Sequence, residues 1–212
     1  MSAKPKTNTK QLWIKLVIIG ALLAVVAWLT KSDMTVIDET IFHAVYGLPA
    51  IFGLASYFLT QTATYYVVLI ISAALFLVGQ KQVSIQIFLK SSLALALALL
   101  IKEILERPRP NVLFDDIVVR FEQTASYGFP SAHTALAVAV ALGLLPFVQA
   151  KYHTVIWFWV VMIALSRIYL GVHTPFDVIG GVLVGLIASL CIQIVTNITA
   201  QKNHSAYAKS RK

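Results

Sequence analysis

Charged residues are scarce in this sequence of 212 amino acids, and cysteine is almost missing. Asp, Glu, Lys and Arg supply 12% of the residues and hydrophobic types 58%, whereas a soluble domain is about one quarter charged. The single cysteine, Cys191, excludes a disulfide framework within the chain and a metal site made of several thiolates. No basic stripe alternates with aromatic side chains, so nucleic-acid binding is not indicated. The composition indicates a membrane protein.

Long apolar segments account for the excess of hydrophobic residues. A helix needs about 20 apolar residues to cross the hydrocarbon core of a bilayer. Six segments reach or nearly reach this length, namely 12–30, 62–79, 86–105, 132–149, 154–171 and 176–198. Because no small-residue cleavage site follows the first segment, it is expected to remain as a span. We therefore predict an all-α fold, a bundle of six transmembrane helices.

Positive charge is divided unequally between the two sides that six spans create. Eleven Lys and Arg residues fall on the side of the termini and six on the other, which places both termini in the cytoplasm by the positive-inside rule. We therefore expect a multi-pass protein of a bacterial cytoplasmic membrane, with cytoplasmic residues 1–11, a six-span domain at 12–199 and a basic, disordered cytoplasmic tail at 200–212. The extracytoplasmic loop 31–61 is expected to form one or two short interfacial helices between the first and second spans.

Basic residues gather where the third predicted span ends. Lys102 lies in its last turns, and Pro108 should end the helix because a residue before proline disfavours the α conformation. Arg109 then follows in a stiff, extended segment. An ammonium and a guanidinium placed side by side would suit phosphate oxygens. Taken alone, the segment is explained more simply as a snorkelling anchor at the end of a span.

The fourth predicted span opens with Pro130-Ser131-Ala132-His133. Ser131 is a typical N-cap residue, and the free N–H groups at a helix start attract anions. His133 can donate or accept a proton near neutral pH. An ordinary cap followed by an interfacial histidine fits this segment equally well.

A third group surrounds the start of the sixth predicted span. Ser166 and Arg167 close the fifth span, and Asp177 follows His173 by four residues. A carboxylate at this spacing can accept the imidazole N–H, fix its tautomer and leave the other ring nitrogen free to attack. Asp177 can also serve as the carboxylate of a capping box that reaches back to Thr174. Because four fixed positions coincide by chance about once in 10⁵ placements, chance explains this group poorly.

Together the three segments resemble the signature of the type 2 phosphatidic acid phosphatase superfamily. That signature is Lys, six residues, Arg-Pro; then Pro-Ser-Gly-His; then Ser-Arg, five residues, His, three residues, Asp. The matching residues occur here in the same order: Lys102, Arg109, Pro110, Pro130, Ser131, Ala132, His133, Ser166, Arg167, His173 and Asp177. The six-span layout is also similar, so the resemblance covers nearly the whole chain. Ala132 departs from the usual Gly, which would matter if this position needed a positive φ.

The resemblance implies a phosphatase that needs no metal ion and no cofactor. His173 would attack phosphorus, Asp177 would stabilise the charged imidazole, and His133 would protonate the leaving oxygen. The groups that would hold the phosphate oxygens are Lys102, Arg109, Ser131, Ala132 and Arg167, and the residues that would support them are Pro110, Pro130 and Ser166. No cluster of carboxylates and imidazoles with metal-ligand spacing appears in the outer segments, where Asp115-Asp116 is the nearest pair and is typical of a solvated loop.

Several alternatives remain open for the substrate and the reaction. The expected partners are membrane lipids, and the expected substrate is a lipid phosphate such as undecaprenyl diphosphate, phosphatidylglycerophosphate or phosphatidic acid. A phosphotransferase of the same family would carry the same catalytic residues. A lipid transporter without catalysis is disfavoured, because the costly charges lie at one rim and no inverted repeat is visible. The sequence does not indicate an oligomeric state.

Overall fold

The computed structural model describes residues 8–31, 35–121 and 126–210, and the side chains up to residue 203. Within these ranges the regular elements are all helical, which confirms the predicted class. In chain order they are α1 (Thr9–Lys31), α2 (Val36–Tyr46), η1 (Ala50–Phe52), α3 (Gly53–Gln61), α4 (Tyr65–Leu77), α5 (Lys81–Leu105), α6 (Pro110–Leu113), α7 (Ala132–Leu144), η2 (Leu145–Phe147), η3 (Ala150–Tyr152), α8 (His153–Tyr169) and α9 (Pro175–Ser210).

Three helices, α5, α7 and α9, pack against one another in the middle of the bundle. Small side chains let them approach closely. A Cβ atom added to Gly181 would lie 2.5 Å from the carbonyl oxygen of Ser131, and one added to Gly185 would lie 2.7 Å from that of Ala135. The first turns of α7 and α9 are therefore held side by side. The seam continues along the helices through the buried residues Ala94, Ala98, Ala135, Ala139, Val184 and Ala188.

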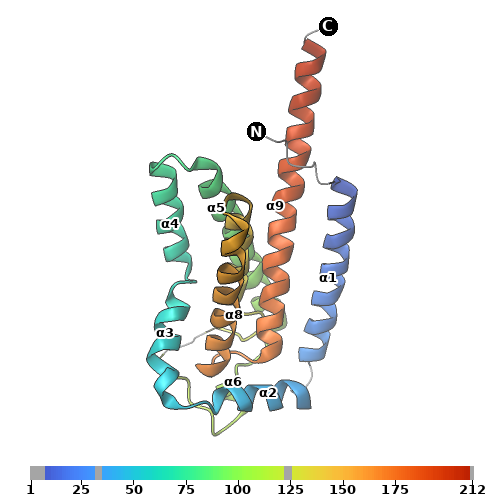
Figure 1. The fold of residues 1–212 in the computed structure, drawn as a ribbon. Helices are drawn as coiled ribbons and strands as arrows, with labels where there is room; N and C mark the ends of the chain where they lie inside the picture. Colours follow the sequence, from blue (N-terminus) through green and yellow to red (C-terminus); the bar gives the residue numbers. More distant parts are fainter. Residues whose placement is uncertain (1–7, 32–34, 122–125, 211–212) are drawn as a thin grey trace.

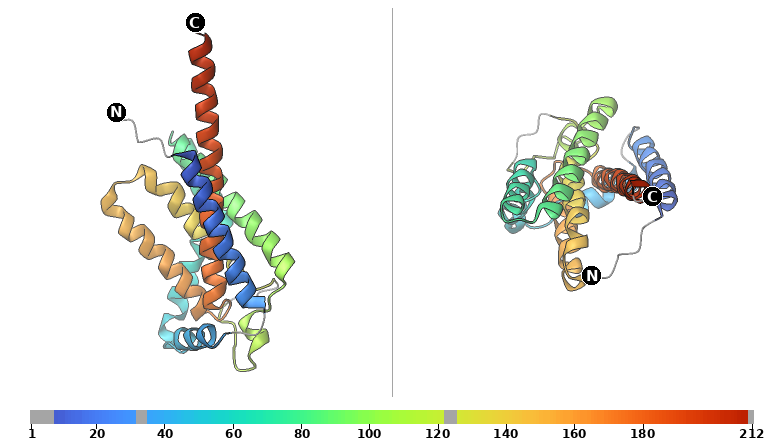
Figure 2. Two further views of the ribbon diagram at one scale, coloured as in Figure 1. Left: turned by 90° about the vertical axis from the view of Figure 1, so that its right-hand side faces the viewer. Right: turned by 90° about the horizontal axis from the view of Figure 1, so that it is seen from above.

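The outer helices surround this centre and leave the functional segments at one end. Helix α1 packs on α9, α4 on α5, and α8 on α3 and α7. Figure 1 shows that α1 begins and α9 ends at one end of the bundle, whereas α2 and α6 lie at the other end. The end of α5 and the starts of α7 and α9 lie at this second end, so the chain brings its three motifs to the same place (Figures 1 and 2).

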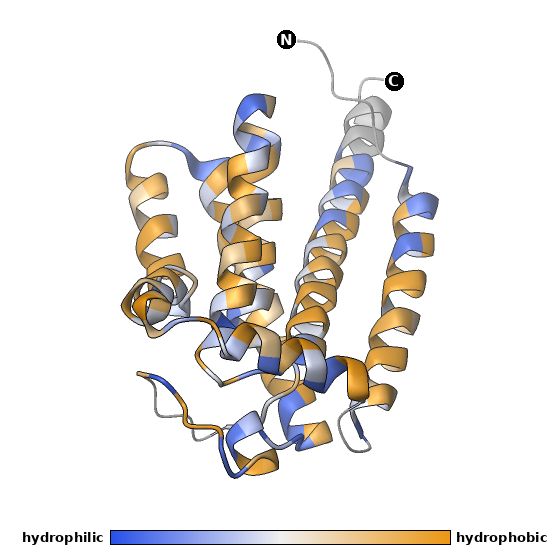
Figure 3. Ribbon diagram, turned by 60° about the horizontal axis from the view of Figure 1, so that its bottom comes forward, coloured by the Kyte–Doolittle hydropathy of each residue, from blue (hydrophilic) through white to orange (hydrophobic). Residues whose placement is uncertain are grey.

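In the part of the chain that the structure describes, four helical segments are long and apolar enough to cross a membrane, and a fifth results if α2 and the η1–α3 segment, which meet at 84°, form one broken span. Hydrophobic residues cover the sides of the helices, and hydrophilic ones gather near their ends (Figure 3). Helices α4 and α7 have 13 residues each, about 20 Å of helix, which is less than the about 30 Å of a hydrocarbon core. The predicted spans 62–79 and 132–149 are therefore longer than the α-helices found there. The first breaks off before Gly79, whose φ is +85°, and the second passes into a 3₁₀ turn that contains Pro146.

The last helix continues beyond its predicted end at residue 198. Helix α9 extends to Ser210, so the expectation of a disordered tail is wrong for residues 200–210. Ala, Lys and Gln supply six of the eleven residues 200–210, and these residues extend an existing helix at little cost. Helix propagation therefore outweighs the polarity on which the prediction of disorder rested.

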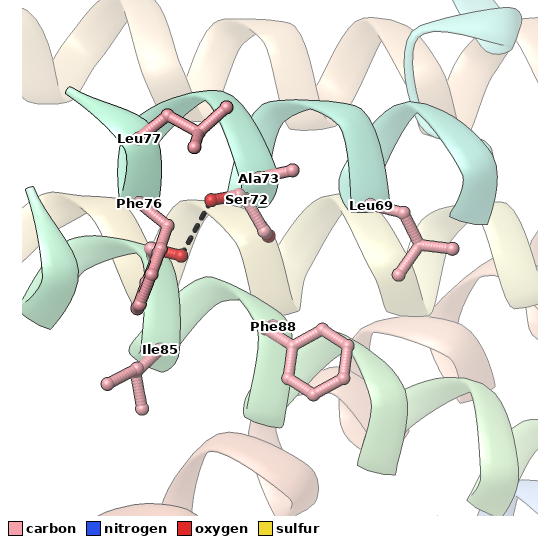
Figure 4. A pocket seen from close by; sticks show the side chains of 8 residues that line it. Leu69, Ser72, Ala73, Phe76, Leu77, Ile85 and Phe88 are labelled. Carbon is pink, nitrogen blue, oxygen red and sulfur yellow. Dashed lines mark hydrogen bonds between the residues drawn. The ribbon is translucent and has the colours of Figure 1, made fainter.

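An apolar pocket of about 530 Å³ lies between α4 and α5, away from the three motifs. Figure 4 shows Leu69, Phe76 and Phe88 at its walls. The Ser84 hydroxyl donates to the Ser72 carbonyl oxygen at 2.6 Å and links the two helices. Because most of the groups on its walls are apolar, the pocket joins the hydrophobic surface of the bundle.

Candidate active site

The end of α5 directs two arginines away from the helix. Glu106 takes the left-handed conformation, with φ 48°, and its N–H closes the helix by donating to the Lys102 carbonyl oxygen at 2.9 Å. The chain then runs in an extended conformation through Arg109, whose φ and ψ are −84° and 164°. This is the helix stop that Pro108 predicts. Lys102 thus points from the last turn while Arg107 and Arg109 project from the segment beside it.

His173 and Asp177 form a buried pair at the start of α9. The Nδ1 atom of His173 lies 3.3 Å from Asp177 Oδ2, and the exposed fractions of the two side chains are 2% and 0%. The same Oδ2 accepts the Thr174 N–H at 2.9 Å, while the Asp177 N–H donates to Thr174 Oγ1 at 3.4 Å. Asp177 is therefore both a capping-box carboxylate and the partner of the imidazole. This arrangement leaves Nε2 of His173 as the ring nitrogen turned away from the carboxylate.

The three motif cations are buried and held by oxygen atoms. Lys102 Nζ donates to the carbonyl oxygens of Tyr127 and Gly128, the latter at 3.1 Å. Arg109 donates to the Val172 carbonyl oxygen at 2.8 Å. Arg167 donates to Thr60 Oγ1 at 3.0 Å. Because backbone and hydroxyl oxygens fix the directions of these side chains, their charges are in place before any ligand arrives.

The positive charges of all three cations act on the ring of His173. Burial lowers the pKa of His173 well below its ordinary value, and the positive charges of Lys102, Arg109 and Arg167 lower it further, as does the neighbouring His133 ring. All three motifs therefore act on one imidazole. The consequence is a neutral, unprotonated histidine at physiological pH, which is the form that can act as a nucleophile.

The start of α7 forms the more open side of the site. The Ser131 N–H donates to the Asp177 carbonyl oxygen at 2.8 Å, so the N-cap of α7 is tied to α9. The Ser131 hydroxyl accepts from Thr134 Oγ1 at 3.0 Å. Ala132 is the first residue of a right-handed helix and is not among the described non-glycine residues with positive φ. Alanine therefore strains nothing in the backbone here. His133 is only partly buried, unlike His173.

Two further residues belong to the site although the motifs do not contain them. Arg107 Nη1 donates to Thr174 Oγ1 at 2.9 Å and to Asp177 Oδ1 at 2.5 Å. Its Nη2 donates to Asp38 Oδ2 at 2.9 Å, and Asp38 Oδ1 accepts the Phe176 N–H at 2.8 Å. Arg107 thus occupies one oxygen of Asp177 and leaves the other to His173. The sequence offers Arg107 only as one more basic residue near the end of the third span, and it gives no signal for Asp38.

The supporting residues lie around this centre without joining it directly. The Ser166 hydroxyl donates to the Ile163 carbonyl oxygen of its own helix at 2.7 Å. Pro110 is the first residue of α6 and is buried, and Pro130 follows a cis peptide bond. Among the described residues, no group of three or more His, Cys, Asp or Glu side chains lies close enough to hold a metal ion.

The charges of the site do not balance, and this defines what it can bind. Four cationic side chains lie buried beside two buried carboxylates: Lys102, Arg107, Arg109, Arg167, Asp38 and Asp177. With a neutral His173 the site carries an excess of positive charge in a region of low dielectric. Such a region is stabilised by an anion with several oxygen atoms. The protein is thus a helical membrane protein in which buried cationic side chains surround a His–Asp pair. We call this group of cations the cationic cup.

The family model of the PAP2 superfamily matches residues 85–200, more than half of the chain, and the protein belongs to this superfamily.

Over 127 residues it is 32% identical to YbjG of Escherichia coli (strain K12), named as a candidate undecaprenyl-diphosphatase; the match covers 59% of this chain and 63% of that protein. Over 145 residues it is 28% identical to the undecaprenyl-diphosphatase of Sulfolobus acidocaldarius, covering 65% and 68%. Over 94 residues it is 38% identical to sphingosine-1-phosphate phosphatase 2 of Homo sapiens, covering 39% and 22%. The chain therefore spans less than two thirds of the first and third of these relatives.

Two solved structures share the fold. LpxE of Aquifex aeolicus superposes with a TM-score of 0.70 at 24% identity, covering 76% of this chain and 97% of that one. The PAP2-type phosphatidylglycerolphosphate phosphatase of Bacillus subtilis gives a TM-score of 0.70 at 24% identity, covering 84% and 94%. At this identity the two structures establish the architecture of the bundle.

Proposed function

We propose that this protein is a membrane lipid phosphatase that hydrolyses a lipid phosphate or diphosphate through a phosphohistidine on His173. The proposal rests on the buried pair of His173 and Asp177, whose Nδ1 and Oδ2 atoms lie 3.3 Å apart. The cationic cup surrounds this pair. Phosphoryl transfer depends mainly on positioning and on neutralising the charge of the transferred group. Both requirements are met by side chains of this chain, without a metal ion.

In the first step Nε2 of His173 attacks phosphorus and the bond from phosphorus to the leaving oxygen breaks. The Nδ1–H of the ring donates to Asp177, which stabilises the positive charge that the imidazole gains. His133 donates a proton to the leaving oxygen. Its partial exposure at the start of α7 suits this role, because the lipid must leave through the open side of the cup. The products are the dephosphorylated lipid and phosphohistidine.

In the second step water replaces the histidine on phosphorus. His133, now neutral, takes a proton from the attacking water, and Nε2 of His173 leaves as inorganic phosphate forms. Lys102, Arg109 and Arg167, with the Ser131 hydroxyl and the Ala132 N–H, hold the phosphoryl oxygens in both steps. The right-handed start of α7 leaves the Ala132 N–H in the direction of a helix N-terminus, where anions bind.

The proposal places the site on the extracytoplasmic side of a six-span bundle. Helices α1, α5, α7 with η2, α8 and α9 supply five spans, and α3 followed by α4 supplies the other as a broken helix. Figure 1 supports this division, because α4 continues in the direction of α3 while α2 lies across the end of the bundle as an interfacial helix. The described acidic residues lie in α2 or in segments near the site, and most basic residues lie toward the opposite end, as the positive-inside rule requires.

The substrate class follows from the chemistry of the cup and agrees with the names of the relatives. Undecaprenyl-diphosphatases and a sphingosine-1-phosphate phosphatase act on single phosphates or diphosphates attached to a lipid. We therefore propose undecaprenyl diphosphate, phosphatidylglycerophosphate or phosphatidic acid as the substrate of this chain.

Phosphate release from these three lipids by purified protein, with a chelator of divalent metals present, tests the proposal. We expect release of inorganic phosphate from at least one lipid without any acceptor lipid, and no loss of rate on chelation. Dependence on an added acceptor lipid would instead identify a phosphotransferase. A strict requirement for a divalent metal would contradict the mechanism.

A further inference from the structure

A cavity with polar groups on its walls lies at the end of the bundle opposite to His173. A groove of about 970 Å³ opens between α1, α5, α9 and the last turn of α7. Its walls are mixed: Gln86 and Gln193 contribute amide groups, and Ile19 and Leu186 contribute apolar surface. A groove that combines amides with apolar walls along membrane helices can take a molecule with a polar head and a hydrocarbon chain.

Lys90 makes this groove unusual. It lies in the first half of α5, and only 6% of its surface is exposed. An ammonium group inside a membrane helix is costly and normally marks a functional partner. Its Nζ atom donates to the Leu142 carbonyl oxygen at 2.9 Å. Lys15 of α1 lines the same groove, and none of its described lining residues is Asp or Glu.

Capping of α7 explains only part of this arrangement. A lysine that donates to a carbonyl near the end of a helix satisfies an otherwise unpaired acceptor and interacts well with the helix dipole. The ammonium has three N–H donors, however, and the capping bond uses one. The capping role also does not account for Lys15 or for the amide groups that face the same space.

We propose that this groove binds the head group of an anionic glycerophospholipid from the inner leaflet. The phosphodiester would lie between Lys90 and Lys15, the amides of Gln86 and Gln193 would bind its ester and hydroxyl oxygens, and an acyl chain would lie against Ile19. Lys90 is nine residues into α5, about 14 Å along the helix, so the bound head group would lie deeper than the head groups of the surrounding lipids. Basic pockets between helices on the cytoplasmic side are suited to such lipids.

Binding of phosphatidylglycerol to the full-length protein in neutral detergent tests the groove. Intrinsic tryptophan fluorescence follows the thermal unfolding midpoint as phosphatidylglycerol or phosphatidylcholine is added. We expect phosphatidylglycerol to raise the midpoint more than phosphatidylcholine does, and Lys90→Gln to weaken the apparent affinity for phosphatidylglycerol about fivefold or more. Lys81→Gln is the matched control, because it removes an exposed cation from the same end of the same helix outside the groove.

Every outcome bears on the proposal. Equal effects of the two lipids, or equal losses in Lys90→Gln and Lys81→Gln, overturn it, because the attraction would then belong to the general surface. If Lys90→Gln does not fold, the exposed Lys15→Gln variant must show the selective loss, and its failure to do so is equally decisive. Phosphatidylglycerol has no terminal phosphate, and the readout is binding, so the result is independent of catalysis at His173.

Discussion

Helix α5 carries two buried lysines, and their surroundings differ. Lys90 and Lys102 are twelve residues apart, about 18 Å along the helix, with exposed fractions of 6% and 2%. Both donate to backbone carbonyl oxygens. Around Lys102 the chain gathers arginines, carboxylates and two histidines, whereas the groove beside Lys90 contains a second lysine and neutral amides.

The comparison shows that a buried cation alone does not make a catalytic site. At the end of α5 that carries Lys102, carboxylates fix the direction of an arginine and an imidazole, so the positive charge is arranged around the proposed nucleophile. Beside Lys90, the described residues that line the groove add a second lysine and neutral donors and acceptors, which suits binding without a reaction. Variants of matched residue types at the two ends can therefore separate chemistry from binding.

The largest expected difference concerns the histidines of the two ends. We expect His173→Ala to lower phosphate release by roughly 10⁴-fold or more, because the nucleophile is lost. His153→Ala, at the start of α8 and at the end of the bundle opposite to His173, should keep the rate of the unchanged protein. Phosphate release under saturating substrate measures both. Residual activity of His173→Ala within tenfold of the control would show that another group attacks phosphorus.

A smaller effect is expected from the residues that hold Asp177 in place. Asp38→Asn and Arg107→Lys should each lower kcat roughly 10- to 100-fold with little change in KM, because the substrate contacts remain while the carboxylate turns. Asp116→Asn is the control, since Asp116 is an exposed carboxylate at the same end. A rise in KM with unchanged kcat would mean that Arg107 binds substrate instead of positioning Asp177.

The pH dependence should separate His173 from an ordinary histidine. Burial and the nearby cations lower the pKa of His173 below its ordinary value of 6.5, so the ring stays neutral as the pH falls through that value. We therefore expect kcat/KM to fall on the acidic side only below pH 6.5. Arg109→Gln removes one positive charge, which should raise the pKa of His173 and move this fall in kcat/KM to higher pH. Nitrogen-15 NMR of the histidine rings measures the same shift directly, and a shift to lower pH would contradict the electrostatic account.

The smallest effect is expected at Ala132. Because this residue already begins a right-handed helix, Ala132→Gly should leave phosphate release within about twofold and lower the free energy of unfolding by at most about 1 kcal/mol. Activity and denaturant unfolding of the variant check both values. A large gain in activity would show that the Cβ atom at this position obstructs the phosphate.

The parts of the site that were predictable from the sequence are local ones. The capping box of Thr174 and Asp177 and the exit of the chain before Pro108 depend on residues within four positions of each other, where helix geometry fixes the distances. Turn chemistry and proline restrictions act over the same range. These features could therefore be derived without knowledge of the packing.

The remaining parts depend on contacts between distant segments. Asp38 reaches Arg107 across 69 positions and Arg167 reaches Thr60 across 107. Helix α2 packs against α8 and α9, and α3 packs against α8. Neither helix carries a motif that indicates its partner. The predicted span boundaries differ from the observed helix ends for a related reason. Hydropathy does not indicate the breaks after α4 and α7, or the helical continuation of α9 to Ser210.

The central claim, that His173 receives the phosphoryl group, is tested most directly by trapping the intermediate. A His133 variant slowed in the second step is mixed briefly with a lipid substrate that carries labelled phosphorus, quenched in alkali and digested for mass spectrometry. The account predicts an alkali-stable phosphoryl group on His173 and none in the same variant carrying His173→Ala. A label on another residue, or turnover with no labelled protein at any time, would contradict it.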